Sequence, residues 1–339
     1  MLKRFFFSLC LLSTLNLLAE EVRTPEEIQG ELQTAQQDFD TAQKIFIPWY
    51  TGPLITGSAN NVPMGHVNLQ GYLFTTVNYA VFNKNRKSVG IPNQWVLNPS
   101  LLFQVGIAPR LDITVSPQGF FKWQKGRNAN EWGDTTVQFG IQIIREKPYI
   151  PSIRLLVGEI FPTGKYRRLS HHRSGLDSTG AGAYRTLFGL NLSKIFWWSP
   201  LHPMSLRFSS NYIFADNRAP VNGLNSYGGG FHTNGKVWVG NSLNLDIGYE
   251  VSINQRWVFS TDIAYTYSNK STFRGNPGVT STGAAAIVGA PSSDQLSLAP
   301  AIEYNLHQSG GFIGGVWFSM TGRNAFNFVS LVLSYTQYF

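Results

Sequence analysis

The chain contains 339 residues, of which 43% are hydrophobic and 14% are charged, and its formal net charge is +8. This composition supports a sizeable core and excludes a disordered or collagen-like chain. After the first residues, no apolar run approaches the roughly 18 to 20 residues that a spanning helix needs, which excludes helical transporters. The basic residues are spread along the chain, so we expect no nucleic-acid partner.

The first residues have the pattern of an export signal. Lys3 and Arg4 precede an apolar stretch over residues 5–18, and Ala19 offers a cleavage site, so we expect residues 1–19 to be a signal peptide. The one cysteine, Cys10, lies inside this segment. The exported chain would then contain no disulfide and no lipid-anchored cysteine. We expect no cofactor and no metal site.

Residues 20–47 are expected to contain an amphipathic helix. Thr24 is a good N-cap, Pro25 suits the first helical position, and Glu27 completes a capping box. Apolar residues recur at spacings of four and three at Ile28, Leu32, Ala35, Phe39, Ala42 and Phe46. This stripe fits a helix that lies against another surface, and it also fits a short coil that joins copies of the chain. Residues 48–65 are predicted to be a linker.

From His66 onward the apolar pattern has a period of two, which indicates half-buried strands. Expected strands begin near His66, Gln94, Leu111, Asp134, Ser152, Ala181, Met204, Lys236, Trp257, Gln295, Gly311 and Ala325. About twelve strands over residues 66–339 suit strands of roughly 9 to 11 residues with their connections. Ten or fourteen strands remain open, because the strands near Ile153 and Val237 are weak.

The expected connections alternate in length. Short ones lie over residues 108–110, 252–256 and 307–310, and long ones lie over residues 162–180, 216–235 and 268–294. Outer-membrane barrels have short periplasmic turns and long exterior loops. A soluble sandwich has no reason to sort its loops in this way.

The C-terminus provides a further local signal. Val329, Leu331, Leu333, Tyr335 and the terminal Phe339 share one face of the last expected strand. Such an ending resembles the assembly signal of bacterial outer-membrane barrels, which implies Tyr335 and Phe339 as the residues that the assembly machinery recognises. Gln337 interrupts the apolar face.

Together these patterns predict an all-β protein: a closed, antiparallel transmembrane β-barrel of about twelve strands over residues 66–339, preceded by a short periplasmic helix. Closure pairs every backbone group that hydrocarbon leaves without a partner. The sequence therefore predicts a location in the bacterial outer membrane, among its lipids.

Four motifs resemble a family of outer-membrane barrels named for the MetA pathway of phenol degradation. They are Pro63-Met64-Gly65-His66, Gly133-Asp134-Thr135, Phe161-Pro162-Thr163-Gly164-Lys165 and Thr321-Gly322-Arg323-Asn324-Ala325. The resemblance covers about residues 53–339. It implies an outer-membrane channel for small or aromatic compounds, and no motif identifies phenol as a ligand.

The polar phase of the strands supplies candidate lumen residues. The basic ones are Arg154, Arg185 and Arg207 on three consecutive expected strands, and acidic ones on the next three are Asp246, Glu250, Asp262 and Glu303. Asp112, Lys122 and Asp134 have the same phase. We expect a basic wall beside an acidic wall, whose field favours small polar or zwitterionic solutes in a passive channel. The alternative is a structural or adhesive barrel in which these charges pair and plug the lumen.

The third exterior loop carries a cluster of basic residues, Lys165, Arg167, Arg168 and Arg173, which suits surface-lipid phosphates or an anionic solute.

A third possible function is that of an outer-membrane lipid hydrolase, because His307 and Ser309 have the spacing of a base and its nucleophile on one strand. That pair falls in an expected periplasmic turn, so we predict no enzymatic activity.

Overall fold

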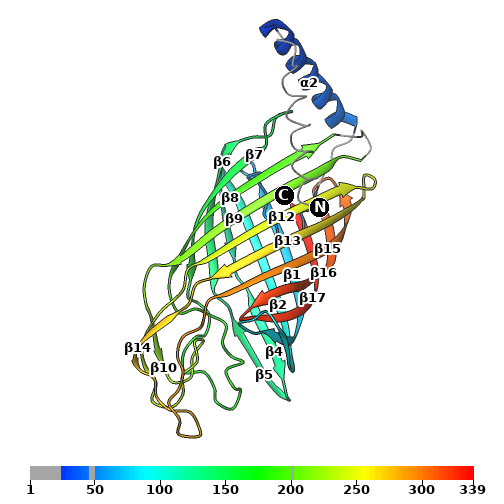
Figure 1. Cartoon of the computed structure of the whole chain (residues 1–339). Coiled ribbons are helices and arrows are strands. Elements are labelled where there is room, and N and C mark those ends of the chain that lie inside the picture. The colour runs from blue at the N-terminus through cyan, green and yellow to red at the C-terminus, as the bar shows by residue number, and fades with distance from the viewer. Residues whose placement is uncertain (1–23, 46–49, 198, 200–201) are drawn as a thin grey trace, which may run out of the picture. The chain divides into compact units, whose positions relative to one another are not determined.

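A computed structural model of the chain describes residues 24–45, 50–197, 199 and 202–339. The helix α2 spans Pro25–Ile45 and belongs to one compact unit, and residues 46–339 form a second unit. Figure 1 shows the strands of the second unit wrapped into a barrel. The predicted signal peptide and Phe46 lie outside the described residues.

Helix α2 begins with the capping box that the sequence predicts. The backbone N–H of Glu27 donates to the Thr24 hydroxyl at 3.2 Å, and the Thr24 N–H donates to the Glu27 carboxylate at 2.8 Å. These two bonds satisfy groups that a helix start leaves without partners. Within the described residues, no helix has both the length and the apolar character needed to cross a bilayer.

The barrel wall consists of twelve antiparallel strands, which confirms the predicted fold class. In chain order they are β1 (Val67–Phe82), β2 (Ser88–Ala108), β3 (Leu111–Ser116), β6 (Thr135–Ile144), β7 (Ser152–Phe161), β8 (Arg185–Phe196), β9 (Met204–Ala215), β12 (Ser242–Ser252), β13 (Trp257–Ser268), β15 (Ser293–His307), β16 (Gly310–Arg323) and β17 (Ala325–Tyr338). The β4–β5 hairpin (Gly119–Gln124 and Arg127–Trp132) extends the wall beside β2, and β10 (Ala219–Asn222), β11 (Asn234–Trp238) and β14 (Thr272–Asn276) form a separate small sheet.

The first strand closes the barrel, because it pairs with both its neighbour in the chain and the last strand. Strand β1 runs against β17 from Asn68↔Tyr338 to Phe82↔Ala325, and against β2 from Val67↔Val105 to Phe82↔Ser88. The backbone of Val67 also exchanges two hydrogen bonds with that of Phe339, at 3.1 and 2.9 Å. The wall therefore has no free edge, as a sheet in hydrocarbon requires.

Strand β17 shows which side of the wall is apolar. Leu331 and Leu333 are each 50% exposed, whereas Ser330 and Ser334 are buried inside the barrel. Apolar side chains thus face outward and polar ones face inward, which is the arrangement of a membrane-spanning barrel and the reverse of a soluble one.

The two ends of the barrel differ in their connections. The connections after β7, β9 and β13 are long and lie at the same end as the β4–β5 hairpin and the small sheet, away from the C-terminus (Figure 1). The turns at the C-terminal end are short, for example the one between β15 and β16. Loops sorted in this way identify the C-terminal end as periplasmic and the other end as exterior.

Two expected strands begin later than the sequence predicts. The strand expected near Lys236 begins at Ser242, and Lys236 itself lies in β11, which alternates like a wall strand but pairs with β10 and β14. The strand expected near Ala181 begins at Arg185, because Ala183 is buried in a small apolar core between the exterior loops.

We expect Ile263→Arg to destabilise the barrel by about 2–4 kcal/mol, because this change places a charge near the middle of the lipid-facing surface. Ile263 is 45% exposed and lies in the middle of β13. The free energy of unfolding, measured by urea titration in lipid vesicles, tests this prediction. Ile253→Arg is the matched control, since Ile253 is 49% exposed but lies in the turn after β12. Equal losses in both variants would contradict a lipid-facing position for Ile263.

Candidate functional site

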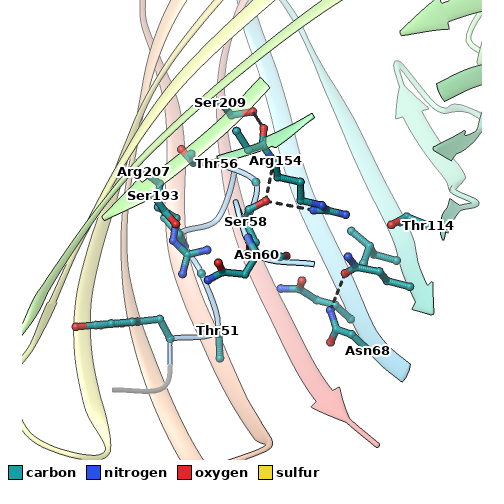
Figure 2. Close-up of a pocket in the computed structure, with 18 of the residues that line it drawn as sticks. Thr51, Thr56, Ser58, Asn60, Asn68, Thr114, Arg154, Ser193, Arg207 and Ser209 are labelled. Atoms are coloured by element: carbon teal, nitrogen blue, oxygen red, sulfur yellow. Dashed lines mark hydrogen bonds between the residues drawn. The ribbon is translucent and has the colours of Figure 1, made fainter. Parts of the chain in front are cut away.

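The lumen contains a stretch of the chain that precedes β1, which we call the inner segment (residues 50–64). Figure 2 shows Thr51, Thr56, Ser58 and Asn60 of this stretch among residues of the surrounding strands. The sequence predicts a linker over residues 48–65, and the part of it that the structure describes is packed against the barrel interior. The inner segment has no charged residue.

Leu54 anchors the inner segment through apolar contact. It is 3% exposed and packs in a cluster with Ala299, Ala301, Ile313 and Val332 of the barrel interior. Removal of such a side chain from water stabilises its position by about 1.5–3 kcal/mol. This cluster is the main apolar contact between the inner segment and strands β15, β16 and β17.

Glycines in the wall allow the inner segment to approach closely. A Cβ on Gly248 would lie 2.6 Å from the Pro53 ring, and a Cβ on Gly106 would lie 1.9 Å from the Pro63 carbonyl oxygen. Both distances are shorter than any tolerated contact. Any larger residue at these two wall positions would therefore displace the segment.

Two of the predicted lumen carboxylates accept hydrogen bonds from the backbone of the inner segment. Asp262 accepts from the N–H groups of Ile55 and Thr56 at 3.2 and 2.9 Å, and from the Thr56 hydroxyl at 2.6 Å. Glu303 accepts from the N–H of Thr51 at 2.9 Å. Bonds to a carboxylate are stronger than those between neutral groups, so this side of the lumen fixes the first half of the segment.

The opposite side of the lumen binds the second half of the segment. Asp112 forms a buried ion pair with Arg154 and accepts from the N–H of Val62 at 3.1 Å. Arg154 and Asn191 both donate to the carbonyl oxygen of Ser58, at 3.2 and 2.8 Å. Arg154 therefore links a wall carboxylate to the backbone of the segment.

The remaining lumen candidates lie at different depths. Arg207 donates to Glu250 at 2.7 Å, and Gly52 lies against its guanidinium. Asp246 is buried on β12. Near the exterior end, Arg185 contacts Asp134 at 3.4 Å, away from the inner segment.

Lys122 belongs to the exterior β4–β5 hairpin and not to the wall strand that the sequence predicts. It donates to the carbonyl oxygen of Ser178 in the β7–β8 connection. The structure therefore brings seven of the nine predicted lumen residues to the interior of the wall and leaves Arg185 and Lys122 towards the exterior. Those seven are Arg154, Arg207, Asp246, Glu250, Asp262, Glu303 and Asp112.

Pairing changes the expected electrostatics of the lumen. The sequence predicts a basic wall on β7, β8 and β9 beside an acidic wall on β12, β13 and β15. In the structure, Arg154 and Arg207 contact carboxylates of β3 and β12, and Arg185 contacts Asp134, which directly precedes β6. Isolated charges in an enclosed space are costly, and pairing reduces that cost. Each of these arginines is thus paired with a carboxylate, and two carboxylates of the acidic side, Asp262 and Glu303, bind the backbone of the inner segment.

A polar cavity of about 430 Å³ remains beside the inner segment. Neutral amides and hydroxyls form much of its lining, namely Asn68, Gln70, Gln104, Thr114, Gln138, Asn191, Ser193, Ser205, Ser209, Asn211 and Thr336. Figure 2 shows Ser193, Ser209, Thr114 and Asn68 around this space, together with Arg154 and Arg207. The cavity therefore offers hydrogen-bonding groups more than apolar surface.

Several polar atoms of residues that line the cavity are buried away from its open space and have no partner within the described part of the chain. They are the side-chain oxygens of Asn68, Asn211 and Thr336, and Nε of Arg154. A buried polar atom that lacks a hydrogen bond costs about 1–3 kcal/mol.

Of the four basic residues predicted in the third exterior loop, one is engaged in ion pairs and three are exposed. Lys165 donates to the buried Asp177 at 2.7 Å and to Glu131 at 3.1 Å. The hydrogen bond to Asp177 raises the pKa of Lys165 above its usual value. Arg167, Arg168 and Arg173 are exposed. The ion pairs of Lys165 thus fix the loop, and its three arginines are exposed to the exterior.

The predicted assembly residues lie on the outer surface near the C-terminal end. Phe339 is 67% exposed, and the Tyr335 ring packs 4.7 Å from that of Phe312. Gln337, which interrupts the apolar face, accepts from the Tyr335 hydroxyl at 2.7 Å. This bond gives the polar side chain of Gln337 a hydrogen-bond partner on an otherwise apolar face.

The His307–Ser309 pair stabilises a turn. Nδ1 of His307 lies 3.1 Å from the Ser309 hydroxyl and also accepts from the Ser309 N–H at 3.3 Å. Within the described residues, no carboxylate hydrogen-bonds to this histidine to orient it as a base. The two hydrogen bonds between His307 and Ser309 stabilise the turn between β15 and β16.

Two of the family motifs contact each other. In the Gly133-Asp134-Thr135 motif, Asp134 accepts from the N–H of Gly164 at 3.0 Å, and the Gly133 carbonyl accepts from the Thr163 hydroxyl at 2.7 Å. Thr163 and Gly164 belong to the motif over residues 161–165. The motifs thus join the start of β6 to the loop after β7.

No protein-family model and no curated protein sequence matches the chain. Among solved structures, the COG4313 outer membrane channel from Pseudomonas putida F1 is similar at a TM-score of 0.63 and 11% identity, over 84% of this chain and 98% of that one. The NanC porin follows at a TM-score of 0.44 and 9% identity, over 79% and 98% of the two chains. The first likeness shows that the fold is that of an outer-membrane barrel.

We expect Asp262→Ala to loosen the inner segment, because the change leaves two N–H groups and a hydroxyl without their acceptor. Ser58→Cys supplies a reporter, since the one native cysteine, Cys10, lies in the predicted signal peptide. Loss of bonds worth about 1–3 kcal/mol raises the rate of maleimide labelling of the introduced thiol by about tenfold or more. Asp246→Ala is the matched control, because no hydrogen bond joins Asp246 to the described inner segment. A labelling rate unchanged by Asp262→Ala would contradict the docking role of this carboxylate.

Proposed function

We propose that the chain forms a passive channel in the bacterial outer membrane that admits small polar solutes. The observation that supports this proposal is the polar cavity of about 430 Å³ beside the inner segment, which is lined largely by amide and hydroxyl side chains. A solute that carries hydrogen-bond donors and acceptors loses its bonds to water when it enters the cavity. It forms new bonds to the side chains of this lining in their place. The inner segment narrows the lumen, so the route admits only small molecules.

The charges that line the cavity support selection among polar solutes. Arg154 and Arg207 reach it from β7 and β9, while Glu146, the carboxylate in the lining, pairs with Lys194 at 2.9 Å and accepts from the N–H of Ile195 at 2.9 Å. The free hydrogen-bonding capacity therefore comes from neutral groups and arginines. Neutral and zwitterionic solutes fit this surface better than cations do.

Aromatic compounds are a second class of solute, which the family resemblance implies. Tyr72 and Tyr338 also line the cavity and offer aromatic surface to such a compound.

A structural or adhesive barrel is the alternative function, and occupation of the lumen by the inner segment favours it. Hydrolysis has no comparable support, because the His307–Ser309 pair is engaged in a turn.

The partners that we propose follow from the surfaces of the molecule. The outward apolar side chains fit outer-membrane lipids, and the exposed Phe339 fits recognition by the barrel-assembly machinery. Ile28 and Leu32 are 46% and 51% exposed on α2, so this helix has apolar surface available to join copies of the chain.

Conductance in planar bilayers and solute swelling of proteoliposomes test the channel. We expect a small, steady conductance, and permeation by a pentose but not by a trisaccharide. Asn211→Trp should lower both conductance and pentose permeation several-fold, because Asn211 lines the cavity. Ser210→Trp is the matched control, since strand alternation directs the neighbouring Ser210 outward. If the native protein carries no current and admits no pentose, the channel is wrong and the structural alternative holds.

A further inference from the structure

The small exterior sheet of β10, β11 and β14 has one apolar face and one basic face. Val237 of β11 is fully buried in the core between the exterior loops, where it packs with Ala183, Ala219 and Val221. Side chains alternate along a strand, so Lys236 projects from the opposite face. Arg274 of β14 lies directly across from Lys236 in the antiparallel register. Two like charges thus occupy one cross-strand pair, which is unfavourable without a counter-ion.

A third cation completes this group, which we call the basic face (Arg218, Lys236 and Arg274). Arg218 directly precedes β10, and its guanidinium lies 4.1 Å from the centre of the Trp238 ring. Arg218, Lys236 and Trp238 line a pocket of about 490 Å³. Asp216 is the one carboxylate in this lining, and it already accepts from the Thr186 hydroxyl at 2.9 Å.

The three cations are exposed, and no ion pair or side-chain hydrogen bond joins any of them to another described residue. Two other exterior cations are paired: Lys165 binds Asp177 and Glu131, and Arg86 binds Asp294. The basic face is therefore a cluster of positive charge for which the described part of the chain provides no counter-ion.

The position of the basic face relative to the membrane follows from the aromatic residues below it. Tyr184, Phe188, Tyr212 and Phe214 lie around the exterior ends of β8 and β9, and the Phe188 and Phe214 rings stack 6.1 Å apart. Such aromatic groups mark the boundary between hydrocarbon and headgroups. Strand β9 ends at Ala215, and the pocket begins at that residue. The basic face thus lies just beyond the boundary, at the level of the headgroups.

We propose that the basic face binds the phosphate groups of outer-leaflet lipid. A guanidinium pairs with phosphate through two parallel hydrogen bonds, and a lysine adds a point charge. The Trp238 ring offers an apolar surface for the sugar or acyl portion of the headgroup. A phosphate between Lys236 and Arg274 supplies the counter-ion that their cross-strand pairing requires. This proposal does not depend on conduction through the lumen.

Binding of lipid A to the full chain in detergent, counted by native mass spectrometry, tests the proposal. The probes are bisphosphorylated lipid A and the same lipid without its phosphates. We expect R218Q/K236Q/R274Q to weaken binding of the phosphorylated lipid by at least about tenfold, because charge-assisted bonds are lost. Binding of the dephosphorylated lipid should be weak and equal in both proteins.

The matched control is R110Q/K147Q/R256Q, which removes the same charge from exposed positions at the periplasmic end. It should leave lipid binding unchanged, and both triple variants should keep the heat-dependent electrophoretic mobility of a folded barrel. Equal affinity of the basic-face variant and the native protein would overturn the proposal. Full competition by inorganic phosphate at equal concentration would also overturn it, since the face would then bind free anions and not lipid.

Discussion

The structure depends on one constraint: a backbone enclosed by a barrel must find hydrogen-bond partners there. The inner segment satisfies this constraint through carboxylates, because Asp262, Glu303 and Asp112 accept from four of its N–H groups. Three of these bonds occupy acceptor oxygens of Asp262 and Glu303 on the acidic side of the lumen. The need for hydrogen-bond partners therefore determines both the position of the inner segment and the polarity of the space that remains in the lumen.

This cause explains why the cavity lies where it does. The inner segment fills the acidic side of the lumen through Leu54 and its carboxylate acceptors. The cavity is lined by the other strands, and most of its amides and hydroxyls come from β1, β2, β8 and β9. Arg154 lies at the junction, since it contacts Asp112, the Ser58 carbonyl and the cavity. A solute that binds in the cavity therefore meets a group that also holds the segment.

The barrel was predictable from the sequence because membrane burial leaves a period of two, seen for example in the outward Leu331 and the inward Ser330. The inner segment was not predictable, because its contacts use backbone N–H groups that every residue carries. Its lack of charged residues was the one available signal, since an exposed linker usually carries some. Lys236 misled the strand prediction, because a loop sheet with one buried face has the same alternation as a wall strand.

The path of the inner segment has a topological consequence. It begins beside Pro203 and Ser252, near the periplasmic ends of β9 and β12, where Tyr50 bonds to both residues. It ends beside Gly106, near the periplasmic end of β2, where Met64 forms a bridge. The segment is thus a re-entrant loop that enters and leaves through one opening. Such a loop needs no threading of a chain end through the ring of strands, so wall closure and loop insertion can occur as separate events.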